Sequence, residues 1–183
     1  MKNRRRNIEN ALASMNHLDV AEVILAHELG QSTEEEPGMS PRQQSIHKRH
    51  LHRRLQAAAV SSDAVEVLGC SELERAASSL SAASRHTSTA AEYSSGGTSA
   101  SSIAIHRNLE LRLKSLKDSL LSLLRDRLPP LVTRLLTAPP NDISLQQTLQ
   151  RCTGHLLRAF VELDAASSAE EALAEAFALP IAR

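Results

Sequence analysis

A run of leucines between residues 105 and 128 constrains the fold of this chain more than any other feature of its sequence. The apolar residues of the run recur at intervals of four, four, three, four and three: Ile105, Leu109, Leu113, Leu116, Leu120 and Leu123. This spacing is close to the heptad repeat with which one helix packs along a seam against another. Further leucines widen the apolar surface beyond a single seam: Leu111, Leu121, Leu124 and Leu128. The run therefore predicts a long helix with partners on more than one side.

The composition extends this expectation to the whole chain. Of the 183 residues, 42% are hydrophobic, but only two are phenylalanine, one is tyrosine and none is tryptophan. The apolar residues are mostly leucine and alanine, which favour helices over sheets of β-branched residues. We therefore expect an all-α fold, a helical bundle or hairpin array of amphipathic Leu/Ala-rich helices joined by long polar loops.

Shifts in composition divide the chain into five segments. An N-terminal amphipathic helix is expected over 1–29, a mobile basic linker over 30–62 and a helix over 63–92. A Gly/Ser-rich loop is expected over 93–102, and a C-terminal helical region over 103–183. The first helix has an apolar stripe and a glycine at its end as a stop signal: Ile8, Leu12, Met15, Leu18, Leu25, Leu29 and Gly30.

Prolines and capping residues divide the C-terminal region. Pro129 and Pro130 are expected to end the long helix, because proline has no amide hydrogen to donate. Asp63 and Asp142 are expected N-caps, and Ser167 with Glu170 forms a predicted capping box. The last two helices are predicted to form a hairpin whose inner face carries both phenylalanines. The expected shared core is Leu113, Leu116, Leu120, Leu149, Leu156, Phe160 and Phe177.

No arrangement of residues typical of catalysis is present in the sequence. The chain lacks GxSxG, HExxH, Walker and GxGxxG motifs, so we expect no enzyme, no catalytic residues and no cofactor. Cys70 and Cys152 lack CxxC spacing, and a buried structural role is expected for Cys152. His47, His50 and His52 offer three imidazoles, but five cations around them oppose a divalent ion. We therefore expect no metal site.

Charge is balanced overall but segregated along the chain. The 21 basic and 21 acidic residues cancel, so the net charge gives no reason to expect a nucleic-acid binder or a membrane-surface protein. Residues 37–62 contain five cations and no acid, whereas 159–182 contain five acids and no base. The basic segment is either a solvated stretch or a contact for an acidic partner or a phosphoinositide surface. No signal-peptide or membrane-spanning pattern is seen, so a soluble protein in the cytoplasm is the expectation.

The outer face of the predicted C-terminal hairpin is the expected partner-binding surface. It carries one base and four acids beside exposed alanines: Arg158, Glu162, Glu170, Glu171 and Glu175. An acidic face of this kind is expected to select partners by charge.

The stretch LLRAFVELDAASSAEEALAEAFALP, residues 156–180, resembles part of the subunit 2 family of the conserved oligomeric Golgi complex. The resemblance rests on a Leu-Arg pair, an aromatic residue, an apolar residue, an Asp and an Ala-Glu pair, with a proline near the end of the next helix, and its spacing matches without a gap up to Glu170: Leu157, Arg158, Phe160, Leu163, Asp164, Ala169, Glu170 and Pro180. Residues 113–136 and 71–84 are similar to the two preceding helices of that family, so the resemblance covers about 71–183.

The resemblance implies a non-catalytic subunit of a vesicle-tethering complex in intra-Golgi retrograde transport. Its partners would be other helical subunits, and it would lie on the cytosolic face of the Golgi membrane, held there peripherally through the complex. The alternative is a small self-contained helical regulator or adaptor, similar to a secretion chaperone or a DNA-associated domain, that uses the basic segment 42–54.

Overall fold

The computed structural model describes residues 2–30, 39–92 and 100–178, and in these ranges it contains helices and no strands. The helices are α1 (Lys2–Glu28), α2 (Pro41–Val60), α3 (Ser62–Glu92), α4 (Ala100–Thr137), α5 (Ile143–Glu162) and α6 (Ala166–Ala178). The predicted all-α bundle is thereby confirmed. None of these helices, over the described residues, combines the length and the apolarity needed to cross a membrane.

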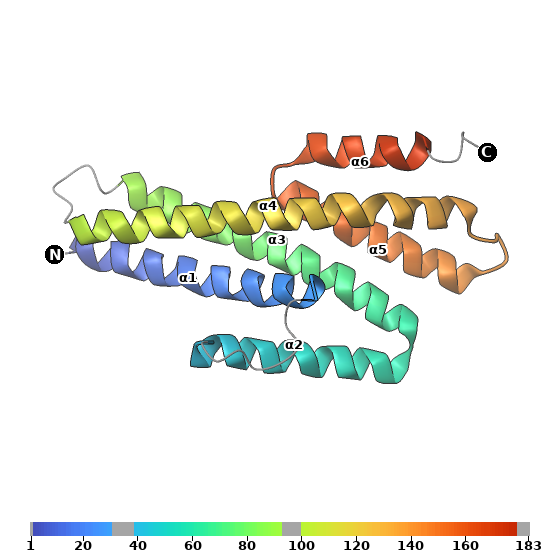
Figure 1. Cartoon of the computed structure of the whole chain (residues 1–183), viewed down its shortest axis with the longest axis horizontal. Helices are drawn as coiled ribbons and strands as arrows, with labels where there is room; N and C mark the ends of the chain where they lie inside the picture. Colours follow the sequence, from blue (N-terminus) through green and yellow to red (C-terminus); the bar gives the residue numbers. More distant parts are fainter. Residues whose placement is uncertain (1, 31–38, 93–99, 179–183) are drawn as a thin grey trace.

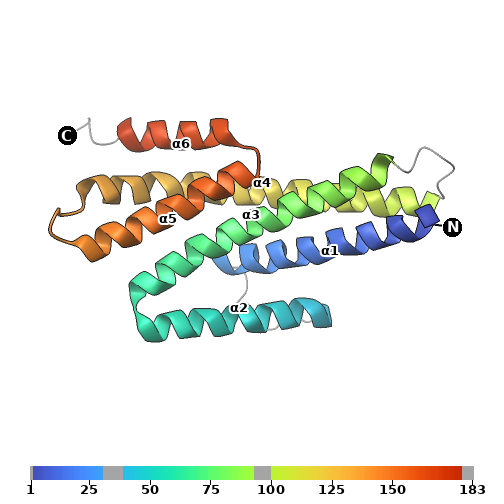
Figure 2. The same ribbon diagram turned by 180° about the vertical axis from the view of Figure 1, so that it is seen from behind.

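The longest two helices, α3 and α4, run through most of the length of the molecule (Figure 1). Helix α3 contacts α1, α2, α4 and α5, so it is the central element of the bundle. Helix α1 packs on one half of α3 and α5 on the other, while α2 lies along α1 and α3 (Figure 2). Helix α6 folds back onto α4. The bundle is therefore elongated, with different helices completing its two ends.

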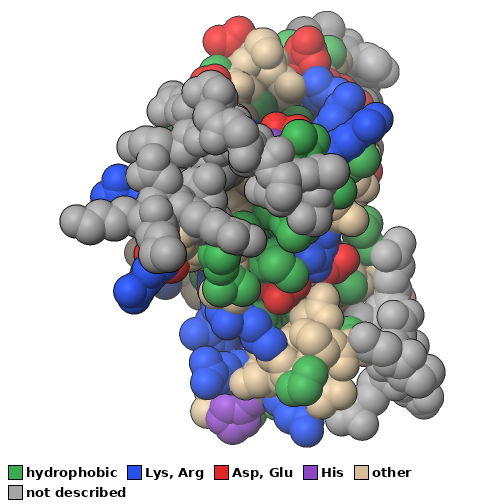
Figure 3. Space-filling model, turned by 90° about the vertical axis from the view of Figure 1, so that its left-hand side faces the viewer, with side chains coloured by type: hydrophobic (Ala, Val, Ile, Leu, Met, Phe, Trp, Pro, Cys, Tyr) green, Lys and Arg blue, Asp and Glu red, His purple; other side chains and the backbone are tan. Residues whose placement is uncertain are grey.

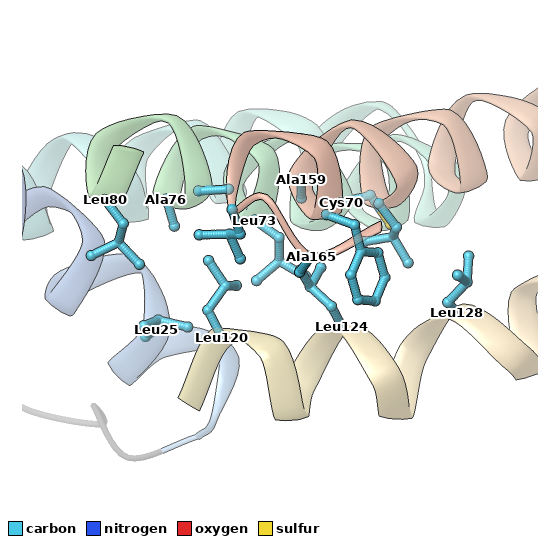
Figure 4. Packing of buried hydrophobic residues seen from close by; sticks show 14 of the residues in the cluster. Leu25, Cys70, Leu73, Ala76, Leu80, Leu120, Leu124, Leu128, Ala159 and Ala165 are labelled. Carbon is cyan, nitrogen blue, oxygen red and sulfur yellow. The ribbon is translucent and has the colours of Figure 1, made fainter. Parts of the chain in front are cut away.

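One hydrophobic cluster runs through all the helices except α2. Leu120, Leu124 and Leu128 of α4 point toward the residues of α3 and α5 (Figure 4). Helix α3 contributes small side chains such as Ala76 between its leucines, and these let neighbouring helices approach closely. The predicted core residues Leu113, Leu120, Leu149, Leu156 and Phe160 are buried in this cluster. Leu116 packs against it but is only partly buried.

Phe177 does not belong to this core. Its side chain is 53% exposed, so its assignment to the inner face of a hairpin is wrong. Helix α6 instead buries a row of small side chains against the bundle: Ser168, Ala169, Ala172 and Ala176. Because α6 packs mainly on α4 and makes few contacts with α5, the bulky ring is not required between the last two helices.

The two prolines in α4 do not end it. Pro129 and Pro130 lie inside the helix, which continues to Thr137. Each proline removes one backbone hydrogen bond, but the flanking residues Leu128 and Leu131 are buried in the core on both sides of the pair. Tertiary packing thus maintains a helix that local sequence rules would end. The helix boundary predicted at this point is wrong.

Residues 41–60 form α2, so the predicted mobile linker over 30–62 is wrong for this part. The helix begins with a capping box in which Ser40 and Gln43 exchange hydrogen bonds, and Pro41 occupies the first turn. Ser61 rather than Asp63 accepts a backbone hydrogen bond at the start of α3. Asp142 caps α5 as predicted. Residues 31–38 of the linker and 93–99 of the predicted Gly/Ser-rich loop lie outside the described residues.

The cap predicted for the last helix is displaced. Helix α6 begins at Ala166, and the carbonyl oxygen of Ala165 accepts from the backbone amides of Ser168 and Ala169. Ser167 is therefore inside the helix. Its neighbour Ser168 is buried and accepts a hydrogen bond from Arg125 of α4, at 2.9 Å. This contact fastens the first turn of α6 to the bundle.

Candidate interaction surfaces

An exposed apolar line follows the first half of α1. Ile8, Leu12 and Met15 were assigned with Leu18 and Leu25 to one apolar stripe, but the first three are exposed and only Leu18 and Leu25 are buried. Helix α1 therefore carries two apolar stripes, and the buried one includes the small residues Ser14 and Ala21. The exposed line is therefore available to another molecule.

The same line continues along α1 into the contact with α4. At the next intervals of four and three come Asp19 and Glu22, and both carboxylates bind the guanidinium of Arg112. Helices α1 and α4 run side by side in the same direction (Figures 1 and 2). The exposed line of α1 thus lies on the edge of α1 that adjoins the first half of α4.

Helix α4 adds exposed apolar side chains at the same end of the bundle. We use the term apolar end for the exposed apolar residues of α1 and α4 at this end of the bundle, of which those on α4 lie on different sides of that helix: Ile8, Leu12, Met15, Ile103, Ile105 and Leu111. Their exposed fractions range from 42% for Met15 to 62% for Leu111. Figure 3 shows hydrophobic side chains gathered near the centre of this end of the molecule. Exposed apolar clusters of this kind typically mark interaction sites.

The charges beside the apolar end are mainly basic. Arg107 and Lys114 are exposed one turn to either side of Leu111, and within the described residues neither forms an ion pair. The acids here have partners on their own helices: Glu9 forms an ion pair with Arg5 at 2.9 Å, and Glu110 lies 3.1 Å from Nε2 of His106. A partner for this surface would therefore carry apolar side chains flanked by acids.

The five residues of the predicted partner-binding surface do not share one face. Glu162 is exposed on α5, and Glu170 and Glu175 are exposed on α6. Arg158 is exposed too, but it donates a hydrogen bond to Glu74 of α3 at 2.8 Å. Glu171, on α6, is 3.3 Å from Arg125 of α4. Because α5 and α6 are not packed as the expected hairpin, the acidic outer face is divided between two helices that contact different neighbours.

The contact of Arg158 has a clear electrostatic consequence. Burial raises the pKa of Glu74, but hydrogen bonds from Arg158 and His155 outweigh this effect and lower that pKa overall. Arg158 therefore contributes to the packing of α5 on α3, and it is less available to a partner than its position in the sequence indicates.

Three histidines meet where α2 packs on α1. Nε2 of His27 and Nδ1 of His47 are 2.9 Å apart, and the His27 and His50 rings are tilted by 35° with centroids 4.6 Å apart. His50 is 2% exposed, and its Nδ1 is 3.5 Å from the carboxylate of Glu72 on α3. Within the described part of the chain, neither nitrogen of His50 has a hydrogen-bond partner. The cluster replaces the missing apolar contact between α2 and the rest of the bundle.

The surroundings of His27 favour its neutral imidazole. Burial, followed by the proximity of His50, His47 and Arg54, lowers the pKa of His27 from its ordinary 6.5 to about 4. Burial raises the pKa of Glu72, but contacts with His50, Arg53 and Arg75 outweigh this and lower it to about 2. The folded chain therefore holds His27 uncharged and Glu72 ionised at neutral pH.

This arrangement predicts that the fold weakens in mild acid. Because the pKa of His27 is lower in the folded chain, its contribution to stability is complete above about pH 6.5 and is lost as the pH falls toward 4. For this partly exposed ring the loss is expected to be about 1–2 kcal/mol, measured by urea unfolding across that range. His27→Gln should reduce this pH dependence, leaving the part that comes from His17, whose pKa burial also lowers, whereas His106→Gln should preserve it. A wild-type unfolding free energy constant from pH 6.5 to 4 would contradict the prediction.

The structure does not assemble the histidines as a metal site. His52, one of the three imidazoles considered from the sequence, is exposed and contacts Gln56 at 3.0 Å, away from His47 and His50. Among the described residues no group of three or more His, Cys, Asp or Glu side chains has an arrangement that could hold a metal ion.

The two cysteines lie together, although 81 residues separate them in the sequence. Cys70 of α3 and Cys152 of α5 are both free and buried. A hydrogen bond with Cys152, together with burial, raises the pKa of Cys70, and accepting that hydrogen bond lowers the pKa of Cys152. No periodicity of the sequence indicated this contact. Its plain role is to pack α3 against α5.

An open groove of about 600 Å³ lies where the end of α2 meets the beginnings of α3 and α5. Its walls mix small, apolar and polar side chains, including Ser61, Asp63, Val67 and Arg151. Arg53 also lines it but binds Glu72 at 2.9 Å. Among the described residues that line it there are hydroxyl side chains but neither histidine nor cysteine.

Comparisons with known proteins add no relative to this description. No protein-family model matches the chain, and neither a curated protein nor a solved structure matches it. The geometry of the described residues is therefore the basis for the functional proposals that follow.

Proposed function

We propose that this chain is a non-catalytic interaction protein that assembles with other helical subunits through its apolar end. The observation that carries the proposal is the row of half-exposed aliphatic side chains on α1 and α4, which the bundle itself leaves uncovered. The occupant we infer is an amphipathic helix with acidic flanks, because Arg107 and Lys114 border the apolar residues.

A partner that covers the apolar end gains free energy in proportion to the apolar surface that it buries. Complete burial of a Leu or Ile side chain contributes about 1.5–3 kcal/mol, so covering the remaining half of such a side chain contributes about 1 kcal/mol. Six side chains of this kind would contribute about 6 kcal/mol together, which offsets only the lower part of the roughly 4–15 kcal/mol lost in translational and rotational freedom, so a bound helix must also gain polar contacts at the rim. Ion pairs at the rim with Arg107 and Lys114 would add specificity and a faster association rate.

The finer form of the proposal is a subunit of a vesicle-tethering complex in intra-Golgi retrograde transport. Its support is the resemblance of residues 71–183 to the subunit 2 family of the conserved oligomeric Golgi complex. An all-α bundle with an uncovered apolar end is compatible with such a role, in which subunits pair through helices. On this proposal the protein is bound peripherally at the cytosolic face of the Golgi membrane.

We expect Leu12→Glu and Leu111→Glu each to weaken binding of the partner about tenfold or more, because each variant removes apolar contact and adds a carboxylate facing acids. The full-length tagged chain would be purified from its source cells, the co-purifying proteins identified, and the affinity of the isolated partner then measured. Val161→Glu, a change of another exposed apolar residue on α5, is the matched control and should leave the affinity unchanged.

Each outcome of this experiment has a definite meaning. A partner that binds both variants as tightly as wild type would show that the apolar end is not the interface. Dimerisation of the pure chain, abolished by Leu12→Glu, would replace the hetero-partner with a second copy. If helical partners are found but none is a subunit of a Golgi tether, the finer proposal fails and the general one stands.

The second candidate function is the self-contained helical regulator or adaptor. The observation that favours it is that the basic segment 42–54 lies in a folded helix, α2, with cations on its exposed side. A regulator would bind its ligand as an isolated, stable chain and with a steep dependence on salt concentration. The tether subunit would instead depend on its helical partners.

A further inference from the structure

The groove of about 600 Å³ between α2, α3 and α5 has a volume typical of sites for small molecules. The turn from α2 to α3 and the beginning of α5 lie at the end of the molecule opposite the start of α1 (Figures 1 and 2). Three lining residues of α5 follow one another at intervals of four and three, so they share one face of that helix: Ser144, Thr148 and Arg151. This face of α5 forms one wall of the groove, and residues of α2 and α3 form the others.

Thr148 presents a buried hydroxyl to this groove. The residue is only 9% exposed, and within the described residues its hydroxyl has no hydrogen-bond partner. Helical threonines commonly donate to a carbonyl three or four residues earlier, as Thr87 does to Ala83 at 3.2 Å, but Thr148 does not. Because Thr148 lines the groove, a ligand that binds there can supply the missing hydrogen bond.

The charged side chains of the groove lie on different walls. On α5, Arg151 is exposed and forms no ion pair within the described part of the chain. On α2, Arg53 binds Glu72 through Nη1 at 2.9 Å, and Glu72 also has Arg75 as a partner at 3.1 Å. On α3, Asp63 is the one acid among the described lining residues. The groove therefore combines an excess of positive charge with a carboxylate that can accept hydrogen bonds.

These groups distinguish among the classes of small anion that could enter the groove. A guanidinium and two hydroxyls on one wall can donate to three oxygens, which a phosphate group has and a carboxylate lacks. The carboxylate of Asp63 would repel a second anionic group, but it can accept from the hydroxyl of a sugar or polyol. A nucleotide is less suited, because no aromatic side chain is among the described lining residues to stack on its base. A phosphate monoester of a sugar or polyol therefore matches the groove best.

We propose that this groove binds a small phosphate monoester with a hydroxylated carbon skeleton, the phosphate lying at Ser144, Thr148 and Arg151 and a hydroxyl of the ligand at Asp63. Val67 of α3 supplies apolar surface for the carbon skeleton between them. The groove is formed by α2, α3 and α5, whereas the apolar end lies on α1 and α4, so the proposal does not depend on the proposed helical partner.

The test is isothermal titration calorimetry of the full-length chain with glycerol 3-phosphate and glucose 6-phosphate, two monoesters of different size. Glucose and inorganic phosphate are titrated separately. Wild type is expected to bind at least one monoester more tightly than glucose or inorganic phosphate, because only a monoester supplies both the phosphate and the hydroxyls. Arg151→Gln is expected to weaken this binding about tenfold or more, and Thr148→Val about fivefold, because each variant removes a hydrogen bond to the phosphate.

Each variant has a matched control outside the groove. Thr153→Val removes a hydroxyl of the same helix that is also without a partner among the described residues, and Arg107→Gln removes an exposed cation of α4. Both controls are expected to bind as wild type does, and helical circular dichroism and melting temperature show whether each variant is folded. Binding of neither monoester, equal losses in variants and controls, or inorganic phosphate bound as tightly as the monoesters would each overturn the proposal.

Discussion

Phe160→Ala is expected to lower the free energy of unfolding by about 3–5 kcal/mol, measured by urea or thermal unfolding. The ring of Phe160 is fully buried in the cluster of α3, α4 and α5, and it is the largest side chain in that cluster. The neighbouring core residues are leucines, alanines and two cysteines, which cannot move far enough to fill the space that a ring leaves.

The other phenylalanine of the chain supplies the matched control. Phe177 lies in the last turn of α6 and is 53% exposed, so Phe177→Ala should change the free energy of unfolding by less than about 1 kcal/mol. Equal losses in the two variants would show that Phe177 packs in the core, as a hairpin of the last two helices requires, and would contradict the structure.

Periodicity of the sequence predicted the long helices well. The leucine spacing of 105–128 is reproduced by α4, and the stripe around Leu149 and Leu156 by α5, because a seam of large aliphatic residues has few other ways to be buried. The cap at Asp142 is similarly local, since the side chain binds an amide three residues away. Such features depend only on neighbouring residues, so the sequence contains all that is needed to predict them.

Features that depend on small side chains were missed. In α1 the large residues Ile8, Leu12 and Met15 are exposed, whereas Ser14 and Ala21 are buried against α3. Ser14 makes this possible by donating a hydrogen bond from its hydroxyl to the carbonyl of Ala83. A pattern of large apolar residues does not reveal a helix face on which small side chains let the neighbouring helix pack closely. The buried face of α6 was predicted wrongly for the same reason, because small alanine side chains rather than Phe177 pack against α4.

Contacts between charged groups on different helices could not be predicted from sequence periodicity either. The segment of α2 has no apolar core residue, so it was interpreted as a linker, yet its Arg53 and Arg54 bind the buried carboxylates Glu72 and Glu28. Arg127 of α4 binds Glu28 as well, at 2.8 Å. Only the local capping box at Ser40 could have indicated the helix. The apolar end could not be predicted from periodicity either, because it depends on α1 and α4 lying side by side.

Leu120→Asp is expected to unfold the chain or to lower the free energy of unfolding by about 5 kcal/mol. Leu120 is fully buried on α4, between residues of α1, α3 and α5, and points into the centre of the cluster (Figure 4). Aspartate at this position loses the burial of the leucine, and its charge meets no cation in this apolar layer. Since domains of this size are stable by about 5–15 kcal/mol, one such change can abolish folding.

Leu116→Asp is the informative comparison, because it lies one turn earlier on the same seam and was predicted from its heptad spacing to share the same core. Leu116 is only partly buried, so the carboxylate of an aspartate at this position can reach water by a change of rotamer. We expect a loss of about 1–3 kcal/mol with the helical circular dichroism preserved. If both variants unfold, the seam is buried evenly along α4, as strict heptad packing requires. If neither changes the melting temperature, α4 does not lie at the centre of the core.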